Sequence, residues 1–596
     1  MRRNPAMTAA VAVVALLALL GVTYHIFDTD FWQHLLMGRA IWTSHAVATT
    51  QLWTWPTYGA PNVNASWGFF ALIWPFWALG GVTGLFVWRW ISILAVLGIL
   101  WALGRRMGGR GFAALAIVVV AALVYRLRSQ IRPETLVAIL FAGEIAILER
   151  ARLGGRDRTP WVIAIAFAWA NAHISYYLGL GVLGIYLLDA LIAGRSDAGA
   201  RARARRLAIT MAGAVAISFV NPFGGRALAQ PFEYFFVWRH EPVYQTIREL
   251  QPVRWSDYAD TTLPEIVFGW PLLILWRALR RQFDRVEIAM CAVFTALGLG
   301  TQRFIGLYAL AATPFMMRDV DAWAATRRWP AWSVDAWVRS GAVIAICAGF
   351  AVAELRRADP RAGVGIDMVH YPVSACDAMT ALGVRGRGFT NFEAGGYQAW
   401  RFWPDRSRLP FMDVHQAGTR EDRRLYALAF GDPRAWRALD DERRFDYVLL
   451  GREREGGNPL LDVLDADSTW ALIFVDDVAA LYVRRHGPLA AVARRVAYAM
   501  VPAGTRALAP LGEAVARDSL IRRAVRGELE RSAAASPWNA GASSLLANVA
   551  LTEGRYEDAG TLLEHALRVN PATGPAHERL ALARDSIAAI ARRGGR

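Results

Sequence analysis

The chain has 596 residues, of which 55% are apolar, and a formal charge of +16 that comes entirely from arginine, because no lysine is present. Long apolar runs recur over about the first 355 residues, and the arginines lie mostly in the short segments between them. This arrangement is typical of a polytopic membrane protein and argues against a nucleic-acid-binding protein. The three cysteines are too few for a disulfide framework or a cysteine-based metal site.

The first apolar run could be a signal peptide, but no small-residue cleavage pattern follows it. We therefore expect an uncleaved first span whose N-terminus lies in the cytoplasm. A bilayer core of roughly 30 Å needs about 20 apolar residues, or fewer where the helix kinks. The apolar runs predict about eleven spans, at residues 6–26, 84–103, 111–126, 133–149, 160–174, 176–194, 206–221, 263–279, 286–301, 303–318 and 339–354.

Residues 67–80 decide the topology. If they crossed the membrane, the arginine clusters at 105–110 and 150–158 would face outward, against the positive-inside rule. If they lie in the interface, the arginine clusters at 105–110, 150–158, 195–206, 277–285 and 318–339 all face inward. Pro75 and the tryptophans of this segment also favour an in-plane helix. We therefore expect the segment after Glu354 to lie outside.

This topology brings polar residues from the ends of several spans to the outer face. They are Asp28, Asp30, His34, Arg126, Arg128, Arg132, Asn171, His173, Asn221, Glu233, Glu249 and Arg303. Such a gathering predicts an outward-facing site.

Asp28 and Asp30 are the candidate catalytic residues. They stand at the start of a long outer loop, residues 27–83, beside Phe27, Phe31 and Trp32. A carboxylate among aromatic rings lies in a low-dielectric setting and becomes more basic, which suits a general base. The alternative is that the pair only marks the interfacial end of a helix.

Other outer residues are candidate substrate ligands. Arg126, Arg128 and Arg132 would hold an anionic phosphate or form salt bridges with the loop-one aspartates. His173 is a structural residue or, with Asn171 beside it, a substrate contact. The remaining candidates are His34, Glu249 as a second acid or a solvated charge, and Arg303 as a phosphate-paired or buried cation. Asp28 and Asp30 could instead hold a divalent cation, and no other cofactor is indicated.

The C-terminal part changes character. Residues 355–486 have strand-length apolar runs between charged helical stretches, which predicts a small extracytoplasmic α/β domain after the transmembrane domain, 1–354. Residues 487–596 form an α-helical tail, in which residues 537–571 are similar to a tetratricopeptide unit. The small and large residues of that unit are Leu546, Gly554, Tyr556, Ala559, Ala566 and Pro571. Such a tail typically binds a protein partner or packs on its own chain.

An ordered set of motifs runs through the first 420 residues. They are Asp28-Thr-Asp-Phe-Trp-Gln-His-Leu35 with Gly38-Arg39, the helix beginning at Trp67, Arg132-Pro133, Trp169-Ala-Asn-Ala-His173, Asn221-Pro-Phe-Gly with Pro231-Phe-Glu233, Arg303, and Asn391-Phe-Glu-Ala-Gly-Gly-Tyr397 with Phe411-Met-Asp413. With these motifs the chain resembles a bacterial membrane-protein family of the GT-C glycosyltransferase class. The resemblance covers about residues 7–420, and Gln33 departs from it where family members often carry an aromatic residue.

The resemblance implies a mainly α-helical GT-C-like membrane protein that takes a sugar from a polyprenyl-phosphate carrier and passes it to an acceptor hydroxyl. It implies an inverting enzyme at the outer face of the bacterial inner membrane. Asp30 would be the general base, with Asp28 as the second choice or a metal ligand. Arg132 and Arg303 would hold the leaving phosphate, while His34 and His173 shape the pocket.

The main rival is a non-catalytic scaffold or assembly factor for envelope polysaccharide or glycoconjugate synthesis. A transporter would instead place charged residues in the middle of spans and broken helices in both halves of the chain.

Overall fold

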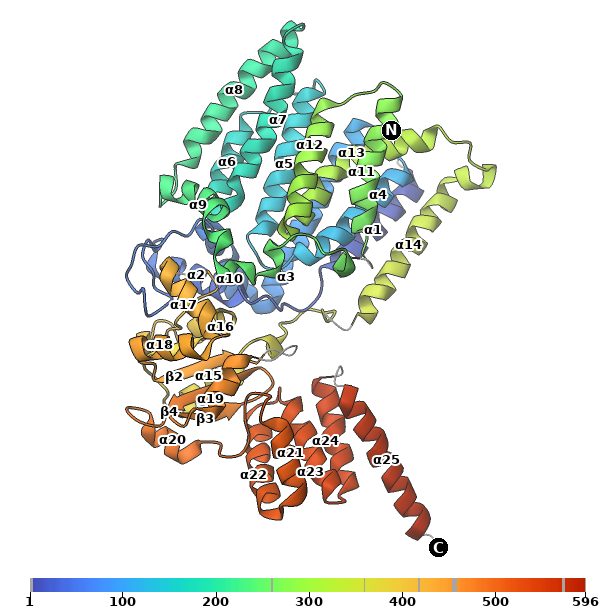
Figure 1. The fold of residues 1–596 in the computed structure, drawn as a ribbon. Helices are drawn as coiled ribbons and strands as arrows, with labels where there is room; N and C mark the ends of the chain where they lie inside the picture. The colour runs from blue at the N-terminus through green and yellow to red at the C-terminus, as the bar shows by residue number, and fades with distance from the viewer. Residues whose placement is uncertain are drawn as a thin grey trace. The chain divides into compact units, whose positions relative to one another are not determined.

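The computed structural model describes residues 4–258, 261–357, 360–415, 418–452, 458–570 and 574–594. The chain forms two compact units (Figure 1). Unit 1 comprises Met1–Thr49 and Asn62–Ile366, and unit 2 comprises Thr50–Pro61 and Asp367–Arg596. The protein is mainly α-helical, as the sequence predicts.

Unit 1 is a bundle of helices. They are α1 (Pro5–Gly21), α2 (Phe31–Ser44), α3 (Trp67–Met107), α4 (Phe112–Tyr125), α5 (Glu134–Arg152), α6 (Trp161–Ala172), α7 (Tyr177–Ala193), α8 (Ala198–Ser218), α9 (Gly225–Phe236), α10 (Pro242–Gln245), α11 (Leu263–Leu279), α12 (Arg285–Gly300), α13 (Ile305–Ala325) and α14 (Ala336–Arg356). Short 3₁₀ turns join several of them and include η1 (Arg126–Arg128), η2 (Ile174–Tyr176), η4 (Arg248–Leu250) and η6 (Gln302–Phe304).

Length and composition mark unit 1 as a membrane bundle. Among the described residues, three helical segments are long and apolar enough to cross a membrane: Trp67–Met107, Ile174–Ala193 and Ala336–Arg356. Shorter apolar helices, among them α1, α4 and α6, accompany them. Large apolar side chains also face outward from the bundle, such as Ile209 at 62% exposure and Leu272 at 61%. That pattern suits a lipid environment, where apolar side chains need no burial.

Helix α3 consists of two helices that meet at Gly81. This glycine has φ 54° and ψ −135°, a backbone conformation that side chains other than glycine rarely adopt. After the turn the chain folds back so closely that a Cβ on Gly84 would lie 1.9 Å from the Phe76 carbonyl oxygen. The sequence division between residues 67–80 and the following span therefore coincides with a real break, and the interfacial position of residues 67–80 stays a prediction.

Residues 27–83, predicted to be a long outer loop, are more ordered than a loop would be, because they contain the buried helix α2. Before α2, residues 23–26 pair with the segment that leads out of α14. The pairing includes bridges from Tyr24 to Ala362 and from Ile26 to Ile366, with the His25 N–H donating to the Arg361 carbonyl at 2.8 Å. This pairing fixes the chain immediately ahead of Asp28.

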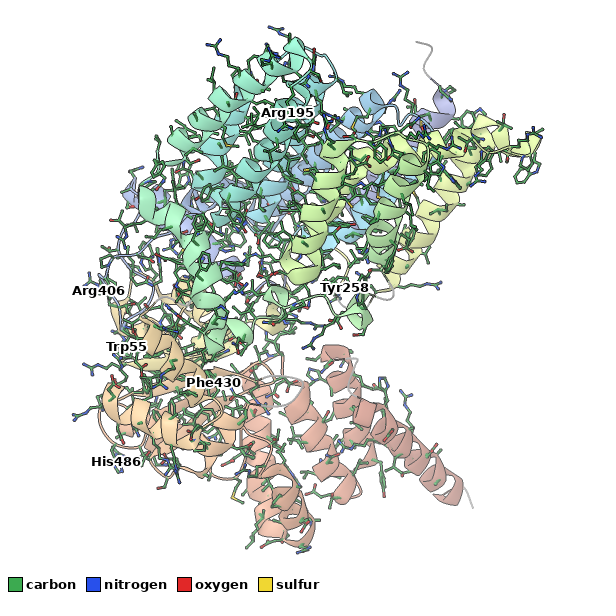
Figure 2. All side chains as sticks on the ribbon, turned by 45° about the horizontal axis from the view of Figure 1, so that its top comes forward. Trp55, Arg195, Tyr258, Arg406, Phe430 and His486 are labelled. Carbon is green, nitrogen blue, oxygen red and sulfur yellow. The ribbon has the colours of Figure 1, made fainter. Side chains whose placement is uncertain are left out.

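In Figure 2, Arg195 and Tyr258 lie toward opposite ends of the unit 1 bundle.

Unit 2 contains a four-stranded sheet of order β1-β2-β4-β3. The strands are β1 (Gly388–Thr390), β2 (Tyr447–Gly451), β3 (Trp470–Val475) and β4 (Ala479–Arg484). Strands β1 and β2 are parallel, with Phe389 opposite Val448, and β4 is antiparallel to both β2 and β3. The helices around the sheet are α15 (Val373–Ala381), α16 (Phe392–Phe402), α17 (Arg420–Ala429), α18 (Pro433–Arg443), α19 (Pro459–Ala466) and α20 (Ala490–Val496). The α/β character expected for this region is therefore present.

The tip of the segment 27–83, residues 50–61, belongs to unit 2. Within it, Trp55 donates from Nε1 to the Gly388 carbonyl at 2.9 Å and from its backbone N–H to the Pro410 carbonyl at 3.1 Å. Its ring packs against Phe411 and Phe445, and Figure 2 labels it together with Arg406 and Phe430 of the same unit. Residues 50–61 are thus integral to the α/β unit, although the sequence places them within the transmembrane domain.

The C-terminal tail is helical, with α21 (Leu508–Arg517), α22 (Ser519–Ala535), α23 (Ala540–Thr552), α24 (Tyr556–Val569) and α25 (Gly574–Gly594). Helices α23 and α24 pack through small residues such as Ala550 and Ala559, and Gly554 turns between them at φ 71°. This helix pair has the form expected of the tetratricopeptide-like unit. The repeat itself stays a prediction, and Pro571 lies outside the described residues.

Candidate active site

The two loop-one aspartates stand at the start of α2. Asp30 is the N-cap residue of that helix, and its side chain makes no capping hydrogen bond to a described residue. Instead its backbone N–H donates to Asp28 Oδ1 at 3.1 Å. Asp28 thus shapes the turn, while the carboxylate of Asp30 is left for other contacts.

A buried arginine, Arg89 of α3, hydrogen-bonds to the backbone that leads into this turn. Its Nη1 donates to the Tyr24 carbonyl at 2.8 Å, and its Nε donates to the Ser129 carbonyl at 2.9 Å. The Tyr24 hydroxyl in turn donates to the Arg126 carbonyl at 3.0 Å. Arg89 therefore ties the segment before Asp28 to the arginine-rich loop before α5. Sequence reasoning missed this residue, although an arginine inside an apolar span was a visible signal.

Arg132 joins the two loops through charge. It holds Asp28 in a bidentate pair, with Nε 2.6 Å from Oδ2 and Nη2 2.7 Å from Oδ1. The same Nη2 lies 3.3 Å from Asp30 Oδ2, and Nη1 lies 2.9 Å from Glu249 Oε2. Salt bridges between this loop and the loop-one aspartates were one of the two expected arrangements, and they are present.

Glu249 of η4 is shared among three arginines. Its Oε2 lies 2.9 Å from Arg128 Nη1 and 2.9 Å from Arg132 Nη1, and its Oε1 lies 3.8 Å from Arg303 Nη1. Burial disfavours the charged form of this carboxyl, but Arg303, Arg132 and Arg128 together outweigh burial and lower its pKa to about 2. Glu249 is therefore an anion at neutral pH.

Glu134 completes the cluster and was not singled out from the sequence. Its Oε1 accepts from Arg303 Nη2 at 2.9 Å and lies 3.9 Å from His173 Nε2. The Nδ1 atom of His173 accepts from the Ser175 backbone N–H at 3.2 Å, which assigns the ring proton of neutral His173 to Nε2, facing Glu134. The adjacent Pro133 made Glu134 look like an ordinary helix start, so no sequence signal distinguished it.

Asp28 and Asp30 differ in exposure and in their contacts with Arg132. The Asp28 side chain is 1% exposed and bound by Arg132 on both oxygens, whereas the Asp30 side chain is 31% exposed and has a longer contact with Arg132. Burial raises the pKa of Asp30, Arg132 opposes this, and Asp28, Glu249 and Glu134 add to the rise, so that the value is about 7. A carboxylate with such a pKa is balanced between its two protonation states near neutrality.

Two of the expected substrate ligands have structural contacts. His34 Nδ1 lies 3.2 Å from the Ile131 carbonyl oxygen, and its ring stacks on Phe70 with centroids 4.8 Å apart. The Asn171 side-chain carbonyl oxygen accepts from Trp67 Nε1 at 3.0 Å, and its amide donates to the Val220 carbonyl at 3.0 Å. His34 thus borders the arginine loop, whereas these contacts place Asn171 at the packing of α3 on α6.

The site therefore combines four carboxylates, those of Asp28, Asp30, Glu134 and Glu249, with three guanidinium groups, those of Arg128, Arg132 and Arg303. Among the described residues, no three His, Cys, Asp or Glu side chains are grouped so that they could hold a metal ion. The possible divalent cation at Asp28 and Asp30 stays a prediction.

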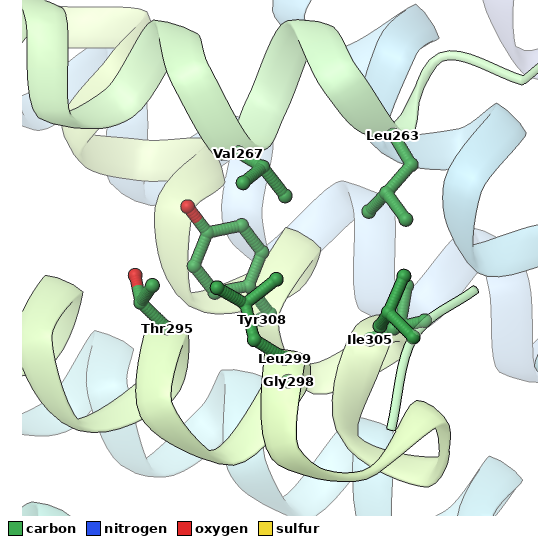
Figure 3. Close-up of a pocket in the computed structure, with 8 residues that line it drawn as sticks. Leu263, Val267, Thr295, Gly298, Leu299, Ile305 and Tyr308 are labelled. Atoms are coloured by element: carbon green, nitrogen blue, oxygen red, sulfur yellow. The ribbon is translucent and has the colours of Figure 1, made fainter. Parts of the chain in front are cut away.

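A small apolar cavity lies beyond the cluster, between α11, α12 and α13 (Figure 3). Its volume is about 10 Å³, which suits one water molecule at most and no sugar. The lining residues are Val253, Leu263, Val267, Thr295, Gly298, Leu299, Ile305 and Tyr308. The charged cluster is therefore the candidate site.

No protein-family model and no curated protein matches the chain. Among solved structures, the chain is similar to the archaeal oligosaccharyltransferase AglB from Archaeoglobus fulgidus, determined in complex with an inhibitory peptide and a dolichol-phosphate. The TM-score is 0.52 at 13% sequence identity, over 75% of this chain and 69% of that chain. ArnT from Cupriavidus metallidurans, apo and bound to undecaprenyl phosphate, gives TM-scores of 0.47 at 14% identity, over 80% of this chain and 97% of that chain. These last scores are too low to support an argument.

At 13% sequence identity, the similarity to AglB shows the fold alone. The chain has a GT-C-like fold, as the resemblance in its sequence motifs predicted.

Proposed function

We propose that this protein is a membrane glycosyltransferase that moves a sugar from a polyprenyl-phosphate carrier to an acceptor hydroxyl. The proposal is supported by the fold shared with AglB, a protein described as an oligosaccharyltransferase and solved with a dolichol-phosphate. It is carried by one observation: Asp30, a half-buried carboxylate with a pKa of about 7, lies 3.3 Å from Arg132, which shares Glu249 with Arg128 and Arg303.

In the proposed reaction, Asp30 removes the proton from the acceptor hydroxyl as the acceptor oxygen bonds to the anomeric carbon of the sugar. The bond between that carbon and the carrier phosphate breaks, and its electrons leave with the phosphate oxygen. Attack from the face opposite the phosphate inverts the anomeric centre. Arg132 and Arg303 stabilise the negative charge that develops on the departing polyprenyl phosphate.

The remaining cluster residues would orient this chemistry. Asp28 fixes Arg132 through two short hydrogen bonds, and Glu134 fixes Arg303. His173 would contact the substrate through the Nε2–H that faces Glu134, and Arg128 would extend the phosphate site. We place this reaction at the outer face of the bacterial inner membrane, with the helical tail available to a protein partner.

The test is transfer by the full-length protein reconstituted in liposomes, with undecaprenyl-phosphate-linked sugars as donors and lipid extracts of the source membranes as acceptors. Asp30→Asn removes the base but keeps the size of the side chain, and we expect loss of transfer in a protein that still inserts and folds. Glu265→Gln is the matched control, because Glu265 is exposed on α11 and is not one of the cluster residues.

Full transfer by both Asp28→Asn and Asp30→Asn would overturn the mechanism. Absence of transfer by the wild-type protein with every donor, together with unchanged envelope glycans in a deletion strain, would favour the scaffold function instead.

A further inference from the structure

Three guanidinium groups converge on a single carboxylate at the centre of the site. Arg128 and Arg132 both direct Nη1 at Glu249 Oε2, each at 2.9 Å, and Arg303 Nη1 approaches Oε1 at 3.8 Å. A phosphate group has the same need for several fixed N–H donors around one anionic oxygen. Glu249 therefore occupies the position that three arginines would offer to a phosphate.

The arginines are held in place without Glu249. Arg128 Nη2 donates to the Gln302 carbonyl at 2.8 Å, Arg132 is gripped by Asp28, and Arg303 is paired with Glu134. Loss of the Glu249 contacts would leave each guanidinium with an anchor and free the two Nη1 groups. The three-arginine cradle is thus preassembled.

Glu249 itself comes from a different part of the chain than the three arginines. It lies on the three-residue turn η4, in the connection between α10 and α11, and its side chain is 22% exposed. Its neighbour Arg248 is 70% exposed. Rotation of one side chain toward solvent would empty the cradle without movement of the helices. The backbone nearby stays tied, because the Gln302 N–H donates to the Gln251 carbonyl at 3.0 Å.

We propose that Glu249 is a placeholder: it neutralises the three-arginine cradle in the unliganded protein and is displaced when the phosphate of the lipid-linked donor binds. This inference rests on the proposed function for the identity of the ligand. The role of Glu249 can be tested separately from that function. A placeholder competes with the phosphate for the arginines, so its removal should tighten phosphate binding, whereas removal of a substrate contact or a metal ligand should weaken it.

The sign of one substitution tests the placeholder. We would measure binding of farnesyl phosphate to the full-length protein in detergent micelles by titration calorimetry. Glu249→Gln keeps the size of the side chain but removes its charge, so its hydrogen bonds to the guanidinium groups weaken. We expect the Kd for farnesyl phosphate to fall about tenfold as a result. An unchanged or higher Kd would overturn the proposal. A higher Kd that is seen only with added Mg²⁺ would also overturn it, because a metal ligand would behave in that way.

Two controls define the site. Glu265→Gln removes an exposed carboxylate of the same unit and should leave the Kd unchanged. Arg128→Gln, introduced into the Glu249→Gln protein, should raise the Kd again, and no rise would refute the cradle. Inorganic phosphate is titrated in parallel. If Glu249→Gln lowers the Kd for farnesyl phosphate alone, the ligand is a lipid headgroup; if it lowers both Kd values equally, the ligand is phosphate itself. Either result supports displacement of Glu249.

The binding assay separates this inference from the proposed function. Tighter binding by Glu249→Gln with no sugar transfer by the wild-type protein would leave the placeholder standing and refute the transferase. Weaker binding with intact transfer would do the reverse.

Discussion

The pair formed by Asp28 and Arg132 should be the most strongly coupled ion pair of the site. Asp28 is 1% exposed and receives two hydrogen bonds from Arg132, at 2.6 and 2.7 Å. Arg132→Gln would leave that carboxylate buried without its cation. Asp28→Asn removes the charge that needs the cation, while Arg132 keeps its contact with Glu249.

The expected energies follow from burial. Removal of one partner from a buried ion pair costs about 3–5 kcal/mol, and since Arg132 is 22% exposed we expect about 3 kcal/mol for Arg132→Gln. Asp28→Asn should cost about 2 kcal/mol through lost charge-assisted hydrogen bonds. The double variant should cost about 3 kcal/mol rather than the sum, because a neutral amide in place of the Asp28 carboxylate no longer requires a cation. The coupling free energy is therefore about 2 kcal/mol.

The assay is equilibrium unfolding of the two single variants and the double variant in mixed micelles, followed by tryptophan fluorescence. The control cycle uses Arg206 and Asp157, whose side chains are 56% and 36% exposed and lie 3.0 Å apart. An exposed pair of this kind should show a coupling of roughly 0.2–1 kcal/mol. If the coupling between Asp28 and Arg132 is no larger than that of the control pair, the reasoning from burial is refuted.

Two further predictions concern Asp30 and Trp55. Because the pKa of Asp30 is about 7 and the base acts as a carboxylate, kcat/KM should rise about tenfold per pH unit below pH 7 and level off above it, and a flat profile between pH 5.5 and 8 would contradict the role of Asp30. This pKa lies above the ordinary value of 3.8, so as pH rises from about 4 to 7 the Asp30 carboxyl ionises in the unfolded chain while it stays largely protonated in the folded protein. The stability of the fold should therefore fall over this range, a dependence that Asp30→Asn should remove. Trp55→Ala should destabilise unit 2 by about 2–3 kcal/mol, less than for a fully buried tryptophan, and make residues 50–61 sensitive to protease. Trp332→Ala, at a side chain that is 71% exposed, should change neither property, and equal protease resistance of wild-type and Trp55→Ala proteins would show that the tip is held in another way.

Much of the candidate site could be predicted from the sequence because topology alone restricts which loops can meet. The positive-inside rule groups Asp28, Asp30, Arg132, Glu249 and Arg303 on one side, and the structure brings these five residues into one ion-paired cluster. No local pattern was required for that prediction. It depended on the placement of residues 67–80, where Gly81 breaks the helix.

The missed features depend on contacts between distant residues. Glu134 and Arg89 acquire their roles from partners that the sequence does not place next to them, Arg303 and the carbonyls of Tyr24 and Ser129. The loop tip is similar, because Trp55 bonds to a residue 333 positions away. Apolar periodicity and charge rules predict which side of the membrane a residue occupies, but they carry no information on which side chain it meets there.

The sequence left open which of the two aspartates is the base, and the geometry at the start of α2 gives the two side chains different surroundings. An aspartate at an N-cap ordinarily uses its carboxylate to accept from the backbone N–H groups of the first turn. Asp30 occupies that position in an αR conformation, with φ −78° and ψ −18°, and its side chain caps no described N–H group. The structural role falls instead to Asp28, which accepts from the Asp30 N–H and pairs with Arg132 on both oxygens. Asp28 therefore accepts the hydrogen bond of the turn and two of the hydrogen bonds of Arg132. Asp30 keeps a half-buried carboxylate with a longer contact to Arg132, and that combination supports the proposal that Asp30 is the base.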